Sequence, residues 1–245
     1  MHEATLSVTL LNHTPMPEEM CAMSARLCYS KADIQELKHK VSQTDQSRFL
    51  GIIMDSGHHS VLEHVSFTFG VEGVSRALLA QLTRHRLASF SVQSQRYVNY
   101  EEGVGYILPP NIRALGQEAV DRYAAQMEQM QTWYGEWCQL LEKGEAGQED
   151  ARFVLPNACE TKLVLTMNVR ELLHFFSLRT CLRAQWEIRA MADEMMTLCK
   201  EAAPALFAKA GPGCVTGPCP EGKKTCGRIQ EVRAKYRTPE DRRTS

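Results

Sequence analysis

From residue 81 to residue 97 the chain reads Gln81-Leu82-Thr83-Arg84-His85-Arg86-Leu87-Ala88-Ser89-Phe90-Ser91-Val92-Gln93-Ser94-Gln95-Arg96-Tyr97. This stretch, called the arginine-rich segment below, holds three arginines, one histidine, three serines and three glutamines in seventeen positions. The planar guanidinium of arginine donates two parallel hydrogen bonds to a phosphate, which suits it to phosphate sites. An ordinary core helix has no use for such a run. We therefore interpret the segment as one half of a site for phosphates and polar ring edges.

The residues before this segment predict a strand and a helix that position it. Apolar residues alternate with polar or small ones over residues 65–71, as in a half-buried strand. A helix is expected over residues 74–84, and the basic run Arg84-His85-Arg86 falls at its end. Cations at a helix C-terminus complement the macrodipole, which accounts for one or two of them. The dipole does not account for Gln81 one turn earlier, or for the polar residues that continue to Arg96 as a loop or irregular strand.

The remaining pattern predicts an α+β fold in which an antiparallel β-sheet packs with long helices. Further strands are expected over residues 5–11 and 161–168, and helices over 46–54, 117–143, 170–180 and 184–202. Residues 31–40 read as a charged segment. We expect a single domain over residues 1–210, followed by a Cys/Gly/Pro-rich tail over residues 211–245.

Composition and charge point to a cytoplasmic protein. The 245 residues carry a formal net charge of -1 and a pI of about 6.7, so bulk charge gives no push toward nucleic acid or membrane. No apolar run approaches the roughly 18 residues that span a bilayer. The N-terminal residues lack the basic start and apolar stretch of a signal peptide.

The nine cysteines fall into two sets. Six are scattered among apolar residues, where reduced thiols behave as small hydrophobic groups: Cys21, Cys28, Cys138, Cys159, Cys181 and Cys199. The other three, Cys214, Cys219 and Cys226, lie in the tail at a spacing unlike a paired Cys-x-x-Cys zinc site. They could hold a metal with a fourth ligand, be redox-active, or belong to a disordered tail, and the sequence leaves these alternatives open.

Two other polar clusters have competing interpretations. His58, His59, Glu63 and His64 could be metal ligands, structural hydrogen-bonding groups or a ligand-binding turn; the motif His-Glu-x-x-His is absent, and we favour the turn, then the structural role, over zinc. A second series spans residues 168–183 and consists of Asn168, Arg170, His174, Arg179 and Arg183. It could be a solvated helix face. Against this, only Glu171 offsets its positive charge, and repelling cations are destabilising unless an anion binds there.

The run Arg84-His85-Arg86, followed by seven residues and then Ser94, resembles the signature of the flavin-dependent thymidylate synthases. The resemblance extends over about residues 5–205 and includes these further stretches: Gly57-His58-x-Ser60-x-x-Glu63-His64, Gln81, Arg96-Tyr97, Arg152-x-Val154-Leu155-Pro156, Asn168-x-Arg170, and Arg179 before Ala184-Gln185-Trp186-Glu187. It implies the thymidylate synthase-complementing protein fold.

The resemblance also implies an activity and its partners. The protein is expected to be a cytoplasmic homotetramer with shared active sites that binds FAD and converts dUMP to dTMP. Methylene-tetrahydrofolate is expected to supply the carbon, and NADPH the hydride. The enzyme is thus expected to be a methyltransferase of nucleotide biosynthesis, with no metal, nucleic-acid or membrane partner.

Site residues follow from the resemblance by position. The nucleotide is expected to contact Gln81, Arg84, Val92, Ser94, Gln95, Arg96, Arg152 and Arg179. The flavin is expected to contact His58, Ser60, Arg84, His85, Arg86, Asn168, Arg170 and His174. Arg179 is the expected catalytic residue, which would lie against the pyrimidine and favour its ionised form.

Four positions depart from the family pattern. Val92 stands where Glu or Gln is frequent, so only its backbone can serve a ligand. Ser91 and His174 each replace a frequent Asn, and Arg183 stands where some members have His. Two other classes of function remain open from the residues: a nucleotide- or RNA-binding module that uses the same arginines, and a metal or thiol enzyme built on the histidine cluster and the tail cysteines.

Overall fold

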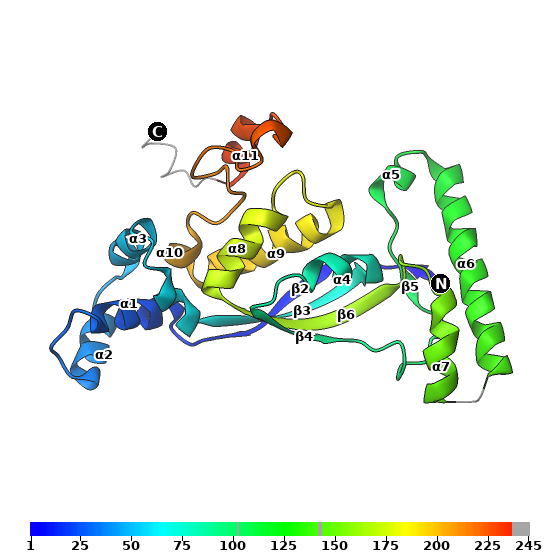
Figure 1. The fold of residues 1–245 in the computed structure, drawn as a ribbon, viewed down its shortest axis with the longest axis horizontal. Coiled ribbons are helices and arrows are strands. Elements are labelled where there is room, and N and C mark those ends of the chain that lie inside the picture. The colour runs from blue at the N-terminus through cyan, green and yellow to red at the C-terminus, as the bar shows by residue number, and fades with distance from the viewer. Residues whose placement is uncertain (102, 142–143, 237–245) are drawn as a thin grey trace. The chain divides into compact units, whose positions relative to one another are not determined.

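A computed structural model describes residues 1–101, 103–141 and 144–236 of the chain (Figure 1). It divides into two compact units. Unit 1 consists of Met1–Val8, Gly70–Arg84 and Phe90–Leu165, and unit 2 consists of Thr9–Phe69, His85–Ser89 and the chain from Thr166 onward. These two units do not correspond to the predicted domain over residues 1–210 and tail over residues 211–245. That division stays a prediction.

The central feature is a four-stranded sheet in the order β2-β3-β6-β4 (Figure 1). Its strands are β2 (Ser7–His13), β3 (Ser66–Ser75), β4 (Ala88–Val92) and β6 (Glu160–Asn168). Thr68 lies beside Thr166, with their hydroxyl oxygens 2.9 Å apart, while Glu72 pairs with Lys162 at 3.0 Å. Residue numbers rise along β3 as they fall along β6, so these strands are antiparallel. The predicted α+β class with an antiparallel sheet is confirmed.

The strands form where the sequence alternates. In β3 the side chains of Phe67, Phe69 and Val71 are buried and their neighbours Thr68 and Glu72 are less buried or exposed. This period of two places one face of the strand in the core. The prediction for residues 65–71 is therefore confirmed, with the strand continuing to Ser75.

Unit 1 adds helices and a short pair of strands to its part of the sheet. β1 (His2–Glu3) pairs in parallel with β5 (Gly105–Tyr106). The helices are α4 (Arg76–Leu82), α5 (Pro110–Arg113), α6 (Gln117–Leu140) and α7 (Glu145–Ala151), with a 3₁₀ turn η2 (Arg152–Val154). Tyr134 of α6 is fully buried and packs in one cluster with Tyr100 and Cys159. The long helix expected over 117–143 is present, although its last two expected positions lie outside the described residues.

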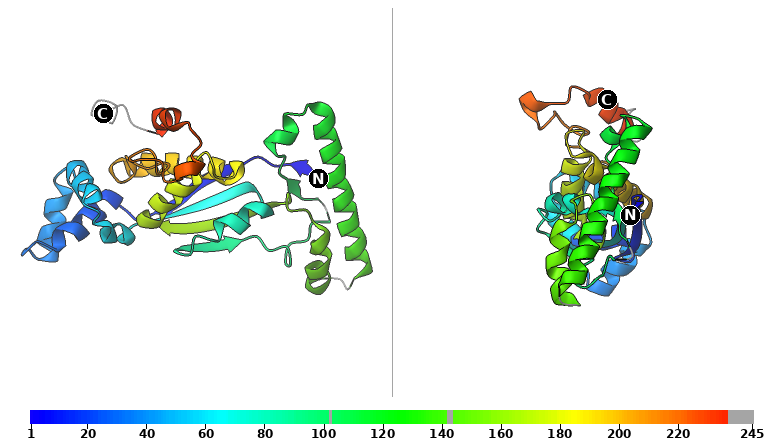
Figure 2. Two further views of the ribbon diagram at one scale, coloured as in Figure 1. Left: turned by 45° about the horizontal axis from the view of Figure 1, so that its top comes forward. Right: turned by 90° about the vertical axis from the view of Figure 1, so that its right-hand side faces the viewer.

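Unit 2 is mainly helical. Helices α1 (Pro17–Leu27), α2 (Ile34–Ser42) and α3 (Ser47–Asp55) form one group, coloured blue to cyan in Figure 2. A 3₁₀ helix η1 (His59–His64) precedes β3. Helices α8 (Val169–Arg179) and α9 (Trp186–Ala202) pack side by side, and α9 is followed by α10 (Pro204–Phe207). The helices predicted at 46–54, 170–180 and 184–202 are thus present with small shifts of their ends.

Residues 34–42 form helix α2, which the sequence analysis did not predict because the segment is rich in charged residues. The Asp33 side chain caps α2 by accepting a hydrogen bond from the Glu36 N–H at 2.9 Å. Leu37 and Val41, four positions apart, supply its buried face. Two apolar residues are a weak periodic signal among charges, so the interpretation of residues 31–40 as a charged segment missed this helix.

The tail forms part of unit 2 and is described as far as Tyr236. It contains a 3₁₀ turn η3 (Gly222–Lys224) and a helix α11 (Ile229–Tyr236). Arg233 donates to the backbone oxygens of Cys214 and Gly217 at 2.9 and 2.8 Å, and the Tyr236 hydroxyl lies 2.7 Å from Asp193 of α9. These contacts join parts of the tail to one another and to α9, while its last predicted residues, 237–245, lie outside the described part. None of the helices in the described ranges is both long and apolar enough to cross a membrane.

Candidate active site

The predicted site residues form one group in each unit, and each group is described by itself. Unit 1 holds Gln81, Arg84, Val92, Ser94, Gln95, Arg96 and Arg152. Unit 2 holds His58, Ser60, His85, Arg86, Asn168, Arg170, His174 and Arg179. Most of the predicted nucleotide residues thus share unit 1, and most of the predicted flavin residues share unit 2.

Helix α4 brings the basic run to its place. The Ser75 hydroxyl caps the helix by accepting from the Leu78 N–H at 3.2 Å, and Leu78 and Leu82 bury its inner face. The helix ends at Leu82 with Thr83 as its C-cap, so Arg84 follows directly as an exposed residue. The expectation that the basic run begins at a helix end is therefore confirmed.

The chain after β4 is fixed by backbone and side-chain contacts within unit 1. The Gln93 N–H donates to the Lys162 oxygen at 2.9 Å, which keeps the segment beside β6. The Ser94 hydroxyl accepts from the Arg96 N–H at 3.1 Å, and buried Gln95 contacts Cys159 Sγ at 3.5 Å. Val92 is half-buried at the end of β4. The segment is thus a short strand followed by a tightly hydrogen-bonded turn.

Arg96 and Arg152 meet at helix α7. Arg96 forms ion pairs with Glu145 at 2.7 Å and Glu149 at 2.8 Å, and the Arg152 Nε–H donates to the backbone oxygen of Glu149 at 3.0 Å. These two arginines lie far apart in the sequence, and both were predicted to bind the nucleotide. In the structure both contact Glu149. The Arg96 side chain is 44% exposed, so its guanidinium can exchange a carboxylate for another anion.

In unit 2, η1 and the start of α8 form one polar corner. The Val169 N–H donates to the Val65 oxygen at 2.9 Å, and Arg170 pairs with Glu63 at 2.5 Å. His58 immediately precedes η1, and Ser60 is exposed within it. The corner thus contains three residues of the predicted flavin set: His58, Ser60 and Arg170.

Along α8 a second group surrounds His85. Asn168 caps the helix through its side-chain oxygen, which accepts from the Glu171 N–H at 2.9 Å. His85 Nδ1 lies 2.8 Å from Glu171 Oε1, and the Arg179 Nε–H donates to His85 Nε2 at 3.0 Å. The rings of Phe175 and His174 lie 4.9 and 5.9 Å from the His85 ring, both edge-on. His85 and Arg179, predicted for different ligands, are in direct contact.

The surroundings of His85 keep its imidazole neutral near pH 7. Burial lowers the pKa of His85 below its ordinary value, and the hydrogen bond to Glu171 opposes this, raising it. Electrostatic interactions with Arg179 and with His174 lower the pKa of His85 further. His85 is 5% exposed, so its side chain is a buried part of the site rather than a surface cation.

The unit 2 group has the chemistry to hold a flavin dinucleotide. Arg86, Arg170 and His174 are exposed, and the first two carry permanent positive charge. A pyrophosphate requires such donors, and the capped N-terminus of the eleven-residue helix α8 adds backbone N–H groups. The donor set therefore fits a flavin whose phosphates lie near these cations.

Buried cysteines are poorly suited to nucleophilic chemistry here. Burial raises the pKa of Cys21 to about 12 and that of Cys159 to about 11, and it also raises the pKa of Cys199. The thiolate is the nucleophilic form of cysteine, so these three side chains stay protonated at neutral pH.

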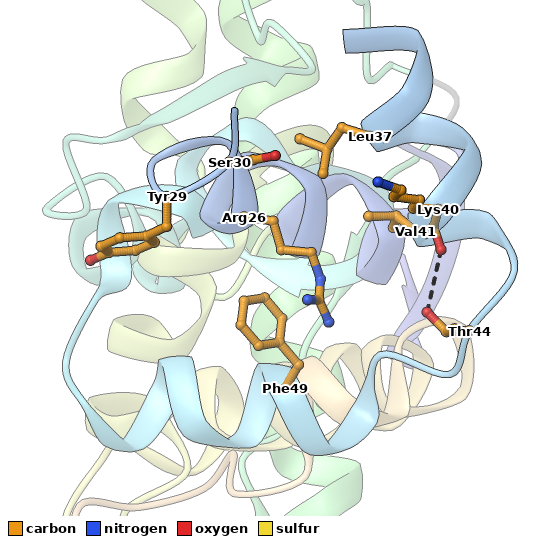
Figure 3. Close-up of a pocket in the computed structure, with 8 residues that line it drawn as sticks. All are labelled: Arg26, Tyr29, Ser30, Leu37, Lys40, Val41, Thr44 and Phe49. Carbon is orange, nitrogen blue, oxygen red and sulfur yellow. Dashed lines mark hydrogen bonds between the residues drawn. The ribbon is translucent and has the colours of Figure 1, made fainter. Parts of the chain in front are cut away.

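A cavity of about 520 Å³ lies among α1, α2 and α3 (Figure 3). The Arg26 guanidinium lies 4.0 Å from the centre of the Phe49 ring and donates to the Gln46 side chain at 3.1 Å. The other lining residues are Tyr29, Ser30, Leu37, Lys40, Val41 and Thr44. Predicted nucleotide and flavin residues are not among these, so we place the candidate site at the two groups above.

Sequence reasoning missed the acidic partners of the site. Glu171 was expected only to offset charge, yet its side chain is 7% exposed and its carboxylate is hydrogen-bonded to His85. The spacing Asn168-x-x-Glu171 signals a helix start, which could have marked Glu171 as close to the site. Glu145 and Glu149, four apart, signal a shared helix face but do not reveal Arg96 as their partner.

The chain is similar to known proteins of one family. Residues 9–205 match the model of the family described as thymidylate synthase complementing protein. A protein from Geobacter sulfurreducens named flavin-dependent thymidylate synthase is 52% identical over 233 residues, covering 95% of this chain and 98% of the relative. A protein of the same name from Clostridium tetani is 46% identical, covering 94% of this chain and 97% of its own.

A solved structure shows a similar fold. The UMP/dUMP methylase PolB from Streptomyces cacaoi, bound with 5-Br dUMP, superposes with a TM-score of 0.71 at 24% identity. The match covers 84% of this chain and 95% of that one.

Proposed function

Because the chain belongs to the family of thymidylate synthase complementing proteins, we propose that it is a flavin-dependent thymidylate synthase that converts dUMP to dTMP. The observation that carries the proposal is the identity of 52% across nearly the whole length of a relative with that name. The matched residues 9–205 include the arginine-rich segment and the polar face of α8. The family, the fold and the placement of cations all favour the same reaction.

The proposal includes the ligands that the sequence resemblance implies. FAD is the flavin, methylene-tetrahydrofolate the carbon donor and NADPH the source of the hydride. The protein acts in the cytoplasm as a homotetramer whose subunits share active sites. Bound FAD supplies the hydride-transfer chemistry, and the side chains of the protein bind, orient and polarise the reactants.

The unit 1 group is suited to the nucleotide phosphate. Arg96 and Arg152 both contact residues of α7, and Ser94 and Gln95 shape the turn that directly follows β4. A hydrogen bond to a charged group contributes about 1.5–3 kcal/mol. Two or three arginines therefore supply much of a micromolar affinity, about -8 kcal/mol. The proposed nucleotide set also includes Gln81 on α4, Arg84 just after that helix, and the backbone of Val92 at the end of β4.

The carboxylates of α7 compete with the phosphate for Arg96. We expect Glu149→Gln to tighten dUMP binding, because the amide no longer neutralises Arg96 or repels the dianion. An exposed ion pair is worth about 0.2–1 kcal/mol, so the expected decrease in Kd is about 1.4- to 5-fold. Calorimetric titration with dUMP measures it, and Glu118→Gln on the exposed face of α6 is the matched control. Weaker binding by Glu149→Gln would show that Glu149 instead orders Arg96 for the nucleotide.

The unit 2 group is suited to the flavin and the pyrimidine. Arg86, Arg170 and His174 offer exposed donors, His58 and Ser60 lie at η1, and Asn168 caps α8. Arg179 lies against the pyrimidine in the proposal, where a positive charge favours the ionised ring and makes its carbon a better nucleophile. Buried His85 then acts through its contact with Arg179 and through its backbone.

A visible absorption spectrum of the purified protein tests the proposed function first. The protein is supplied with FAD without oxygen, and NADPH is added with and without dUMP. We expect a bound flavin that loses its colour on reduction, and faster loss of colour with dUMP, because both sites serve one reaction. Formation of dTMP after addition of methylene-tetrahydrofolate completes the test. A protein that binds no flavin under these conditions is not this enzyme.

A further inference from the structure

His85 lies across one face of helix α8 and contacts residues on three successive turns. Glu171, Phe175 and Arg179 are spaced by four, so their side chains lie along neighbouring positions of that face. The His85 ring packs edge-on against Phe175, with Nδ1 toward Glu171 at 2.8 Å and Nε2 toward Arg179 at 3.0 Å. The imidazole thus bridges the first and last turns of the helix.

The chemistry of the two partners fixes where the imidazole proton resides. Arginine stays protonated and its Nε can only donate, so His85 Nε2 must present a lone pair to it. The carboxylate of Glu171 can accept, so Nδ1 carries the proton. His85 is therefore neutral, with its proton on Nδ1, for as long as both contacts exist.

Glu171 is more than a helix-start residue. A glutamate three positions after a capping residue often bonds back to the backbone of that residue. Here the carboxylate instead accepts from a ring that comes from a segment 86 positions away. Glu171 and His85 are 6% and 5% exposed, and burial of such polar groups is costly unless each is hydrogen-bonded. The buried hydrogen bond between Glu171 and His85 therefore fixes the positions of both side chains.

We propose that Glu171 and His85 are positioning residues for Arg179, and that they hold its guanidinium in the orientation that faces the pyrimidine. This inference rests on the proposed function. Glu171 fixes the tautomer and tilt of the imidazole, and the imidazole lone pair fixes the Nε end of Arg179. With its Nε held in this way, the guanidinium keeps one orientation, and so do its other N–H groups. Metal sites use the same principle, in which a hydrogen bond from a neighbouring residue orients a ligand side chain.

The arrangement depends on the neutral state of His85. Among the described residues, the charged and titratable groups that face its ring are Glu171, Arg179 and His174, all on α8. Protonation of Nε2 would replace the acceptor by a donor, which repels the Arg179 Nε–H. Because the pKa of His85 lies below its ordinary value, this contact is present at neutral pH and is lost as pH falls through the lowered value.

Two substitutions at Glu171 separate positioning from general support of the fold. Glu171→Gln keeps an oxygen that accepts from Nδ1 but removes the charge, and Glu171→Leu removes the acceptor at similar size. We expect Glu171→Leu to lower kcat roughly tenfold or more at every pH, with FAD affinity changed by less than about twofold. We expect Glu171→Gln to recover most of that loss and to move the acid limb of the pH profile to lower pH, because Glu171 raises the pKa of His85.

A double-mutant cycle shows whether Glu171 acts through Arg179. The Kd for dUMP is measured by calorimetry in the wild type, Glu171→Leu, Arg179→Ala and the double variant, after circular dichroism confirms that each is folded. We expect Glu171→Leu to weaken binding in the wild type and to add nothing in the Arg179→Ala background. An equal loss in both backgrounds, or equal losses for Gln and Leu at position 171, would overturn the proposal.

A spectroscopic measurement tests the contact without reference to catalysis. In protein labelled with ¹⁵N-histidine at pH 8, the His85 resonances should show the proton on Nδ1 and an unprotonated, hydrogen-bond-accepting Nε2, and Glu171→Leu should disturb this pattern. A proton on Nε2 in the wild type would refute the inference whatever the activity. Failure of the wild type to form dTMP, with the Nδ1 tautomer present, would instead refute the proposed function.

Discussion

Arg179→Ala is expected to lower dTMP formation by a factor on the order of 10²–10³ while FAD remains bound, since the loss of one donor aimed at developing charge commonly costs this much. The guanidinium lies at the last turn of α8, where His85 holds its Nε. Alanine removes the positive charge that we propose favours the ionised pyrimidine. The residues proposed to hold the flavin lie at η1, at Arg86 and along the exposed side of α8, and this substitution leaves them in place.

The measurement combines steady-state dTMP formation with the flavin absorption of the purified variant. Arg179→Lys keeps the charge but cannot donate in the forked geometry of arginine, so we expect it to remain strongly impaired. Arg122→Ala on the exposed side of α6 is the matched control and should have wild-type turnover. Normal turnover by Arg179→Ala would remove Arg179 from its role, and loss of flavin would assign it to the cofactor.

The elements that position the site could be predicted because their signals are local. The alternation of Phe67, Phe69 and Val71 marks β3, and the apolar period after Asn168 marks α8. The basic run was expected at the end of a helix over residues 74–84; the helix that forms, α4, ends at Leu82, and the first two expected helical residues belong to β3. Each of these features depends on neighbours within a few positions of the chain.

The pairings within the site could not be predicted because they join distant segments. His85 meets Glu171 across 86 positions, and Arg96 meets Glu149 across 53, so the sequence shows charges without their partners. His85 shows the consequence. The family resemblance implied a flavin contact at His85, whereas its side chain is buried and both ring nitrogens are engaged by Glu171 and Arg179. A role of the His85 backbone toward the flavin stays a prediction.

Gly73→Ala is expected to destabilise the protein by about 2–5 kcal/mol, from about 1–2 for the backbone conformation and about 1–3 for overpacking. Gly73 in β3 has a φ of +67°, which L-residues with a side chain rarely adopt. An added Cβ would lie 1.9 Å from the backbone oxygen of Thr5 and 2.8 Å from the nitrogen of Leu6. Backbone atoms cannot turn aside as a flexible side chain can, so β3 and the segment before β2 would have to separate.

Thermal unfolding followed by circular dichroism measures this effect. For a chain of this size each kcal/mol shifts Tm by about 2–4 °C, so a decrease of roughly 4–20 °C is expected. Gly51→Ala is the matched control, because Gly51 lies inside α3 with no atom within 4 Å of the added Cβ. It should stabilise the protein by up to about 1 kcal/mol. An unchanged Tm for Gly73→Ala would mean that the segment at Thr5 moves away without cost.

The same glycine links stability to the site. The Gly73 N–H donates to Glu160 at 3.2 Å, and only two residues later Ser75 caps α4, which carries Gln81 and ends before Arg84. A shift of β3 at Gly73 therefore changes the start of the helix that presents these two residues. We expect folded Gly73→Ala protein, measured well below its Tm, to bind dUMP more weakly than Gly51→Ala. Equal affinities would show that the Ser75 cap fixes α4 independently of the strand before it.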